Sequence, residues 1–146
     1  MDGVILAIDA GTTSVRCMAF DSDGKELLMT QRPIMQYYPG PGMVEQDPME
    51  IRDSCIQVTR DCISSIGADR ILAVGITNQR ETTIVWDRET GVPIHPAIVW
   101  QDRRTHSRCE SLCEEAIGQQ IFEVTGLHPD AYFSATKLEW ILHEDQ

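Results

Sequence analysis

Two short apolar runs joined by a glycine turn open the chain and constrain its fold more than any other segment. The first run, Val4–Asp9, ends in a carboxylate, and the second, Val15–Phe20, follows one glycine and three hydroxyl residues. Apolar runs of this length bounded by turn residues predict buried strands, so a β-hairpin is expected here. Gly11 permits both a tight turn and the close approach of a ligand to the backbone.

The tip of this hairpin carries groups that suit phosphate and a divalent cation. Thr12, Thr13 and Ser14 add hydroxyl donors to the main-chain N–H groups of the turn, which together form a concave anion site. The Asp9 carboxylate would repel phosphate unless it holds Mg²⁺, usually through water, and the phosphate shares that ion. The segment is neither a Walker A loop nor a GxGxxG fingerprint. The alternative is an ordinary hairpin in which Asp9 and Gly11 serve only the turn.

Turn residues and apolar runs predict the strands that follow. Glu26–Gln31 is expected to form a third strand after a turn in which Gly24 can take positive φ. Tyr37–Met43, with two prolines and two glycines, is expected to be a loop. The continuous apolar run Ile71–Ile76 predicts a buried central strand. Further short strands are predicted over Thr82–Trp86 and Ala97–Trp100.

A long helix is predicted from Pro48, with Asp47 as its N-cap and Glu50 completing a capping box. Its apolar residues recur at helical spacing and the helix is expected to stop at Gly67; they are Ile51, Cys55, Val58, Cys62 and Ile66. Shorter helices are predicted over Thr105–Ala116, Gln119–Thr125 and Thr136–His143. Since no repeat, low-complexity tract or linker interrupts this order, no domain boundary is expected within the chain.

Composition and charge limit the function. A net charge of −11 and a pI near 4.6 argue against nucleic acid or an anionic membrane as partner. No apolar run reaches transmembrane length, and no signal peptide is expected. Five cysteines without a short-spaced framework are typical of reduced thiols in the cytoplasm. His106, Cys109 and Cys113 share a predicted helix face, but without a CxxC pair or a fourth ligand they favour buried thiols over zinc.

A second polar segment, Thr77–Thr83, follows the predicted strand Ile71–Ile76 and contains no hydrophobic residue. Adjacent strand residues point to opposite faces, so Arg80 and Glu81 can address one ligand only if the backbone turns there. An arginine donates to two neighbouring hydroxyls and a carboxylate accepts from them, which suits a small polyol. The alternative is an exposed loop with an incidental ion pair.

Aromatic residues in the second half of the chain add two candidates. Trp100 can pack against a carbon skeleton, and the Tyr132 hydroxyl can hydrogen-bond an alcohol, although each is also typical of a core or rim aromatic. The last predicted helix is strongly apolar at Leu138, Trp140, Ile141 and Leu142, so it is expected to pack against another part of the protein.

Taken together, these segments resemble the FGGY carbohydrate kinases, and most closely their glycerol kinase branch. The resemblance covers nearly the whole chain in order, and its Asn78–Trp86 block is highly specific to that branch. It is carried by Asp9–Ser14 with Arg16, Pro41–Glu50, Gly75–Trp86, Ala97–Gln101, Arg103–Thr105 and Tyr132–Lys137.

The resemblance implies a ribonuclease-H-like fold of the actin/hexokinase/Hsp70 ATPase type, an α/β domain with a mixed sheet and flanking helices, incomplete at its C-terminus. Thr12, Thr13, Ser14 and Arg16 would lie at the phosphates of ATP, and Asp9 would face Mg²⁺. The implied reaction converts ATP and glycerol into ADP and glycerol 3-phosphate, through positioning and neutralisation of phosphate charge.

The resemblance also implies the substrate contacts. Arg80, Glu81 and Tyr132 would hold the glycerol hydroxyls, and Trp100 would lie against the carbons. Ala10 stands where glycerol kinases usually have Gln, so a kinase for another polyol or sugar is one alternative. A non-catalytic actin-like nucleotide-binding module is the other.

Family members are several times longer than this chain. Their catalytic aspartate, the general base, and their adenine pocket would lie beyond residue 146, so no catalytic residue is assigned here. Residues 1–146 would be the first part of the N-terminal domain, with the second domain absent and no kinase activity alone. The full-length enzyme is expected to be a cytoplasmic homo-oligomer with no membrane insertion.

Overall fold

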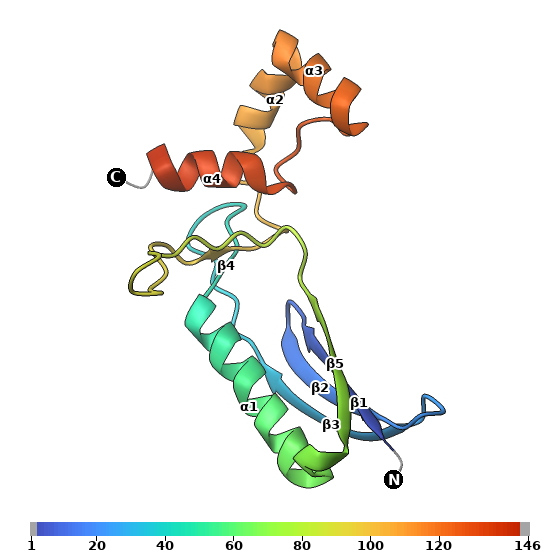
Figure 1. Cartoon of the computed structure of the whole chain (residues 1–146). Helices are drawn as coiled ribbons and strands as arrows, with labels where there is room; N and C mark the ends of the chain where they lie inside the picture. The colour runs from blue at the N-terminus through green and yellow to red at the C-terminus, as the bar shows by residue number, and fades with distance from the viewer. Residues whose placement is uncertain (1–2, 144–146) are drawn as a thin grey trace. The chain divides into compact units, whose positions relative to one another are not determined.

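The chain folds as two compact units in this computed structural model, which describes residues 3–143 (Figure 1). Within these residues, unit 1 comprises 3–35 and 47–79, and unit 2 comprises 36–46 and 80–143. The backbone passes between the units at three points, so no single linker marks the division in the sequence.

Unit 1 is a mixed sheet with one helix against it. The strands β1 (Val4–Ala10), β2 (Ser14–Phe20) and β3 (Glu26–Pro33) form an antiparallel meander, and β5 (Ile71–Asn78) runs parallel to β1. The strand order is β3-β2-β1-β5, and α1 (Pro48–Ile66) packs on the sheet (Figure 1). The predicted hairpin, meander and long helix are confirmed.

Both ends of α1 follow the predicted signals, with one difference in the cap. The Asp47 carboxylate accepts a hydrogen bond from the Met49 N–H at 2.8 Å, and Gly67 ends the helix at φ 93°. Glu50 does not complete the expected capping box. Its two carboxylate oxygens instead accept from the Met35 N–H, each at 3.4 Å, and so tie the first turn of α1 to the segment after β3.

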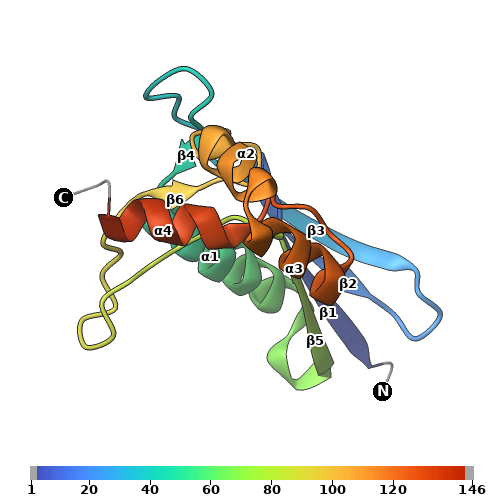
Figure 2. The ribbon, with the colours of Figure 1, turned by 90° about the horizontal axis from the view of Figure 1, so that it is seen from above.

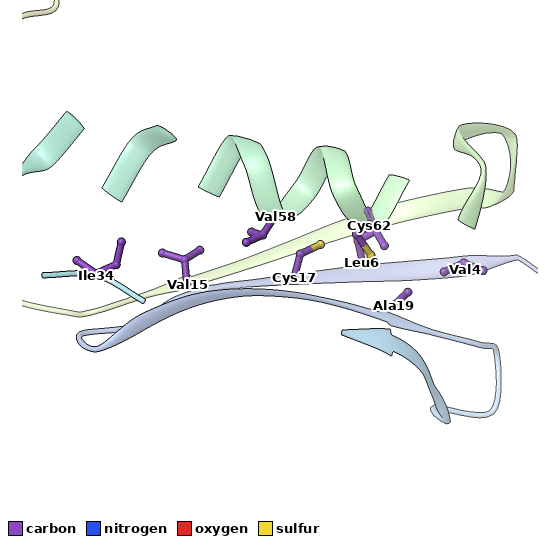
Figure 3. Close-up of a cluster of buried hydrophobic side chains, with 8 residues drawn as sticks. All are labelled: Val4, Leu6, Val15, Cys17, Ala19, Ile34, Val58 and Cys62. Atoms are coloured by element: carbon purple, nitrogen blue, oxygen red, sulfur yellow. The ribbon is translucent and has the colours of Figure 1, made fainter. Parts of the chain in front are cut away.

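The core of unit 1 lies between α1 and one face of the sheet (Figure 3). Its buried members are Val4, Leu6, Val15, Cys17, Ala19, Ile34, Val58 and Cys62. Each large apolar side chain buried here contributes about 1.5–3 kcal/mol of transfer free energy. Because strand residues alternate between faces, the intervening residues of β1 and β2 stand on the face away from α1.

The expectation of a buried central strand over Ile71–Ile76 is wrong about the position of the strand. The strand forms, but β5 lies at the edge of the sheet, and Leu72, Val74 and Ile76 are 75%, 51% and 75% exposed. A continuous apolar run signals a strand with apolar surroundings on both faces. Within residues 3–143, β1 is the only strand paired with β5, so its other edge has no strand partner there.

Unit 2 contains a short ladder and three helices. The strands β4 (Glu45–Gln46) and β6 (Ala97–Ile98) pair antiparallel, and α2 (His106–Glu114), α3 (Ala116–Thr125) and α4 (Ser134–His143) follow (Figure 2). The predicted helices are confirmed. The expected strand over Thr82–Trp86 is reduced to single bridges from Thr83 to Ile98 and from Trp86 to Pro93, and Ala97–Trp100 is shortened to β6.

A buried ion network lies just before α2 in unit 2. The Arg104 side chain is 1% exposed and donates to Asp102 at 2.9 Å and to Glu45 at 2.6 Å. Its guanidinium lies 4.5 Å from the centre of the Trp140 ring. Burial alone lowers the pKa of Arg104, but the hydrogen bonds to Asp102 and Glu45 outweigh burial and raise it above the ordinary value.

All five cysteines are free thiols. Cys109 is buried as expected, whereas Cys113 is exposed, contrary to the expectation, because it lies near the end of α2 on its solvent side. Among residues 3–143, no group of three or more His, Cys, Asp or Glu side chains is arranged to hold a metal ion. No helix in the described range is both long and apolar enough to cross a membrane.

Candidate functional site

The predicted site residues fall into two groups, one in each unit. Unit 1 carries the residues expected at phosphate and metal, namely Asp9, Thr12, Thr13, Ser14 and Arg16. Unit 2 carries those expected at a polyol, namely Arg80, Glu81, Trp100 and Tyr132.

A row of polar residues crosses all four strands of unit 1. The strand register pairs Gln31 with Arg16, Arg16 with Asp9, and Asp9 with Thr77. Paired positions share a face of the sheet, and this row stands on the face away from α1. A carboxylate, a guanidinium, an amide and a hydroxyl therefore line up where the parallel strands β1 and β5 reach their carboxyl ends, the edge at which parallel sheets bind ligands.

The β1–β2 turn beside this row is too tight for any side chain at Gly11. A Cβ there would lie 2.9 Å from the Ser14 carbonyl oxygen. The Thr13 carbonyl accepts from the Ile34 N–H at 3.0 Å, which fixes the turn to the segment after β3. The turn is thus a rigid loop whose backbone an anion can approach closely.

The three hydroxyl residues of the turn differ in exposure. Thr13 is exposed, Thr12 is half-buried, and Ser14 is buried. The Ser14 Oγ accepts a hydrogen bond from the Gln31 side chain at 2.9 Å, and a hydroxyl that accepts one bond still has a proton to donate. Thr13 is therefore the most exposed of the three hydroxyl residues, and Ser14 is held by Gln31.

One donor of the Arg16 side chain is buried without a hydrogen bond to any residue that the structure describes. The donor is the Nε, and Arg16 as a whole is half-buried. An unsatisfied buried donor costs about 1–3 kcal/mol, so a bound anion at this place would remove a penalty. Mg²⁺ is usually held by one or two carboxylates together with water and substrate phosphate, and Asp9 is the one carboxylate in the polar row of unit 1.

In unit 2, the backbone turns sharply at Glu81, as the polyol hypothesis requires. Glu81 has φ 63°, in the left-handed region that non-glycine residues rarely adopt, and Arg80 before it is exposed. Such a conformation costs about 1–3 kcal/mol and persists only where the surroundings impose it. The Glu81 carboxylate accepts from the Ser134 hydroxyl at 3.1 Å.

Lys137 connects Glu81 with Tyr132. Its Nζ donates to the Glu81 carbonyl at 2.8 Å and to the Tyr132 carbonyl at 2.9 Å, and the residue is 0% exposed. Burial lowers the pKa of Lys137 from 10.5 to about 8, although the nearby carboxylates of Asp102, Glu81 and Asp130 oppose the shift. The Tyr132 N–H in turn donates to Asp130 at 2.7 Å.

Aromatic contacts complete this cluster. The Trp100 and Tyr132 rings meet edge to face with centroids 6.0 Å apart, and Tyr132 meets Phe133 at 5.2 Å. The main-chain N–H of Trp100 donates to the Thr82 hydroxyl at 3.2 Å. Glu81, Trp100 and Tyr132, predicted from separate segments, are thus brought together within unit 2.

Sequence reasoning assigned no role to Ser134 or Lys137, although both lie in the Tyr132–Lys137 segment that carries the resemblance. A signal was available for Lys137, since it is one of only two lysines in the chain and lies in the predicted helix beside the apolar residues Leu138, Trp140, Ile141 and Leu142. No local pattern indicates the serine, because its partner Glu81 is distant in the sequence. A separate pocket of about 450 Å³ along α2 and α4 is lined by Arg104 and Arg108, which already pair with carboxylates, and by no predicted site residue.

The sequence of this chain is similar to those of glycerol kinases. The chain is 56% identical over 138 residues to a glycerol kinase of Haloferax volcanii, covering 93% of this chain and 27% of that protein. It is 51% identical over 144 residues to a glycerol kinase of Petrotoga mobilis, covering 97% and 29%. The chain therefore spans less than a third of the length of these relatives.

Solved structures agree on the fold. Plasmodium falciparum glycerol kinase with ADP superposes with a TM-score of 0.89 at 33% identity, covering 99% of this chain and 29% of that one. Gluconate kinase from Lactobacillus acidophilus, at 22% identity, also gives 0.89 and supports the fold alone. The expected actin/hexokinase-like fold with a mixed sheet is confirmed. Residues 4–146 match the N-terminal domain of the FGGY family of carbohydrate kinases, and the chain belongs to that family.

Proposed function

We propose that this chain is the N-terminal part of a longer kinase that transfers a phosphoryl group from ATP to glycerol, producing glycerol 3-phosphate and ADP. The observation that carries the proposal is the grouping of Glu81, Trp100 and Tyr132 within unit 2. The names of the relatives support glycerol as the substrate.

The chemistry of that cluster suits a three-carbon polyol. The Glu81 carboxylate accepts hydrogen bonds from hydroxyls, the exposed Arg80 guanidinium donates two, and the Tyr132 hydroxyl does either. Trp100 supplies an apolar surface for the carbon chain. Sugars offer similar hydroxyls, so discrimination would depend on the size of the space around these groups.

The unit 1 residues supply the phosphate side of the proposed reaction. Thr12, Thr13 and Ser14 would donate to the ATP phosphates, with the half-buried Arg16 guanidinium neutralising their charge. Asp9 would hold Mg²⁺, usually through water, and the ion would bridge to phosphate oxygens. Phosphoryl transfer is accelerated mainly by such positioning and charge neutralisation.

The activity is proposed for the longer enzyme and not for these 146 residues, which form the first part of its N-terminal domain. The general base and the adenine pocket are expected in the remainder, and the longer enzyme is expected to be a cytoplasmic homo-oligomer. ATP-dependent phosphorylation of glycerol by the 146-residue chain would contradict this assignment.

Two other functions are distinguished by rates and by one variant. Steady-state rates of the longer enzyme on glycerol, erythritol and xylulose separate a glycerol kinase from a kinase for another polyol or sugar, since the fold is common to xylulose kinases as well. If the chain belonged to a non-catalytic nucleotide-binding module, Arg80→Ala would leave glycerol binding unaffected. For the proposed glycerol kinase, we expect Arg80→Ala to raise the KM for glycerol.

A further inference from the structure

Lys137 is a buried cation whose two hydrogen bonds both go to residues of the proposed polyol site. The Nζ reaches the carbonyl oxygens of Glu81 and Tyr132, at 2.8 and 2.9 Å, from its position on α4. Both bonds go to main-chain carbonyl oxygens, so Lys137 fixes the backbone of Glu81 and Tyr132. It leaves the polar atoms of their side chains available to the substrate.

The surroundings of Lys137 keep it charged at neutral pH despite its burial. Asp102, Glu81 and Asp130 favour the ammonium form, whereas burial and Arg104 oppose it, and the pKa settles at about 8. A buried ammonium is unfavourable unless its donors are satisfied, and carbonyl oxygens are good acceptors for it. The two carbonyl bonds are thus the contacts that compensate the burial of this group.

Glu81 needs such support because its backbone is strained. Its φ of 63° is maintained against the preference of a residue with a Cβ. Lys137 holds its carbonyl, and Ser134, three residues earlier in the same helix, donates to its carboxylate at 3.1 Å. The first turn of α4 therefore fixes both the main chain and the side chain of Glu81.

We propose that Lys137 is the positioning residue of the polyol site, holding Glu81 and Tyr132 at a fixed separation through one ammonium group bonded to both carbonyl oxygens. The inference rests on the proposed function of those two residues. Lys137 touches no reacting atom in this role, so its loss should weaken glycerol binding selectively and leave the ATP site intact.

The test uses the longer enzyme with Lys137→Met, which keeps the unbranched apolar part of the side chain, is one atom shorter and removes the donors. We expect the KM for glycerol to rise at least tenfold while the KM for ATP stays within twofold. Lys25→Met, at the other lysine of this chain, lies in the exposed turn before β3 and is expected to change neither. An unchanged KM for glycerol, or an equal rise in both constants, would overturn the proposal.

A second readout keeps the inference independent of activity and of a single variant. In Lys137→Met, hydrogen–deuterium exchange should accelerate at the main-chain amides of Thr83 and Phe133 and remain unchanged in α1. In the wild-type structure these two amides donate to the carbonyl oxygens of Ile98 and Asp130. If Lys137→Met fails to fold, the same two measurements on Lys137→Arg decide, with smaller changes of the same kind expected. A wild-type enzyme inactive on every polyol would refute the proposed function, whereas unchanged exchange in a folded variant would refute the positioning role.

Discussion

Asp9 and Arg16 occupy directly opposed positions on β1 and β2, so a carboxylate and a guanidinium stand together on the face of the sheet that α1 does not cover. Gln31 and Thr77 extend this pair into a polar row across the sheet. A positive and a negative group at the carboxyl end of parallel strands match the two partners of a magnesium–phosphate complex. The proposed phosphate-binding residues of unit 1 can therefore be tested separately from the proposed polyol-binding residues of unit 2.

Replacing Arg16 by Met in the longer enzyme should weaken ATP binding. A hydrogen bond to a charged group is worth about 1.5–3 kcal/mol, which corresponds to a rise of roughly ten- to a hundredfold in the KM for ATP. The matched control is Arg32→Met, since Arg32 is exposed and faces Asp61 at 3.8 Å. Kinetics with varied ATP at saturating glycerol measure the effect, and equal constants for the two variants would contradict a phosphate role for Arg16.

Gly11→Ala should distort the β1–β2 turn that is proposed to bind phosphate. The added Cβ would meet the Ser14 carbonyl at 2.9 Å, a backbone atom that cannot move without displacing β2. We expect loss of nucleotide binding, measured by titration with ADP, at a destabilisation of about 1–3 kcal/mol. Gly75→Ala is the control, because its Cβ would lie 3.9 Å from the nearest atom. Normal ADP binding by Gly11→Ala would show that the turn tolerates a side chain.

Much of unit 1 and its candidate site could be predicted because the signals are local. The apolar runs, Gly11 and the Asp47 N-cap each act on residues nearby in the sequence, and the structure follows them. The edge position of β5 could not be predicted, since Leu72, Val74 and Ile76 indicate an apolar environment without specifying which elements provide it.

The proposed polyol site around Glu81 and Tyr132 shows the same limit of sequence-based prediction. The need for a turn at Glu81 followed from side-chain alternation alone, and its φ of 63° fulfils that expectation. What holds the turn did not follow, because Lys137 and Ser134 reach Glu81 across a long stretch of chain. Tertiary packing brings such partners together, and neither periodicity nor spacing encodes it.

Asp102→Asn should destabilise unit 2 strongly. Asp102 is 1% exposed, bonds to Arg104 at 2.9 Å and accepts from the Val44 N–H at 2.7 Å. Arg104 keeps Glu45 as a partner, so losing the charged hydrogen bonds of Asp102 is expected to lower the free energy of unfolding by about 1.5–3 kcal/mol. Asp53→Asn, in an exposed pair with Arg52, should change the free energy of unfolding by less than about 1 kcal/mol. Urea unfolding compares the two, and similar values would contradict the structural role of the network.

Lys137 should also give the protein a distinctive pH dependence of stability. Its pKa in the folded chain is about 8, below the ordinary 10.5, so between these pH values the unfolded chain binds more protons and the contribution of Lys137 to stability rises with pH. Cys17 acts in the opposite sense, because burial and the Cys62 thiol raise its pKa from 9.0 to about 12, and its contribution is lost as pH rises through that range. Comparison with Lys137→Met cancels the cysteine effect, since both proteins keep Cys17.

The free energy of unfolding of the wild type should therefore increase relative to Lys137→Met as the pH goes from 8 to 10, by up to about 1.4 kcal/mol for each pH unit. Urea titrations of both proteins at three pH values in this range measure the difference. Lys25→Met carries no buried ammonium and should follow the wild type at every pH. A difference between wild type and Lys137→Met that stays constant with pH would mean that the Lys137 ammonium titrates in the folded chain as it does in water.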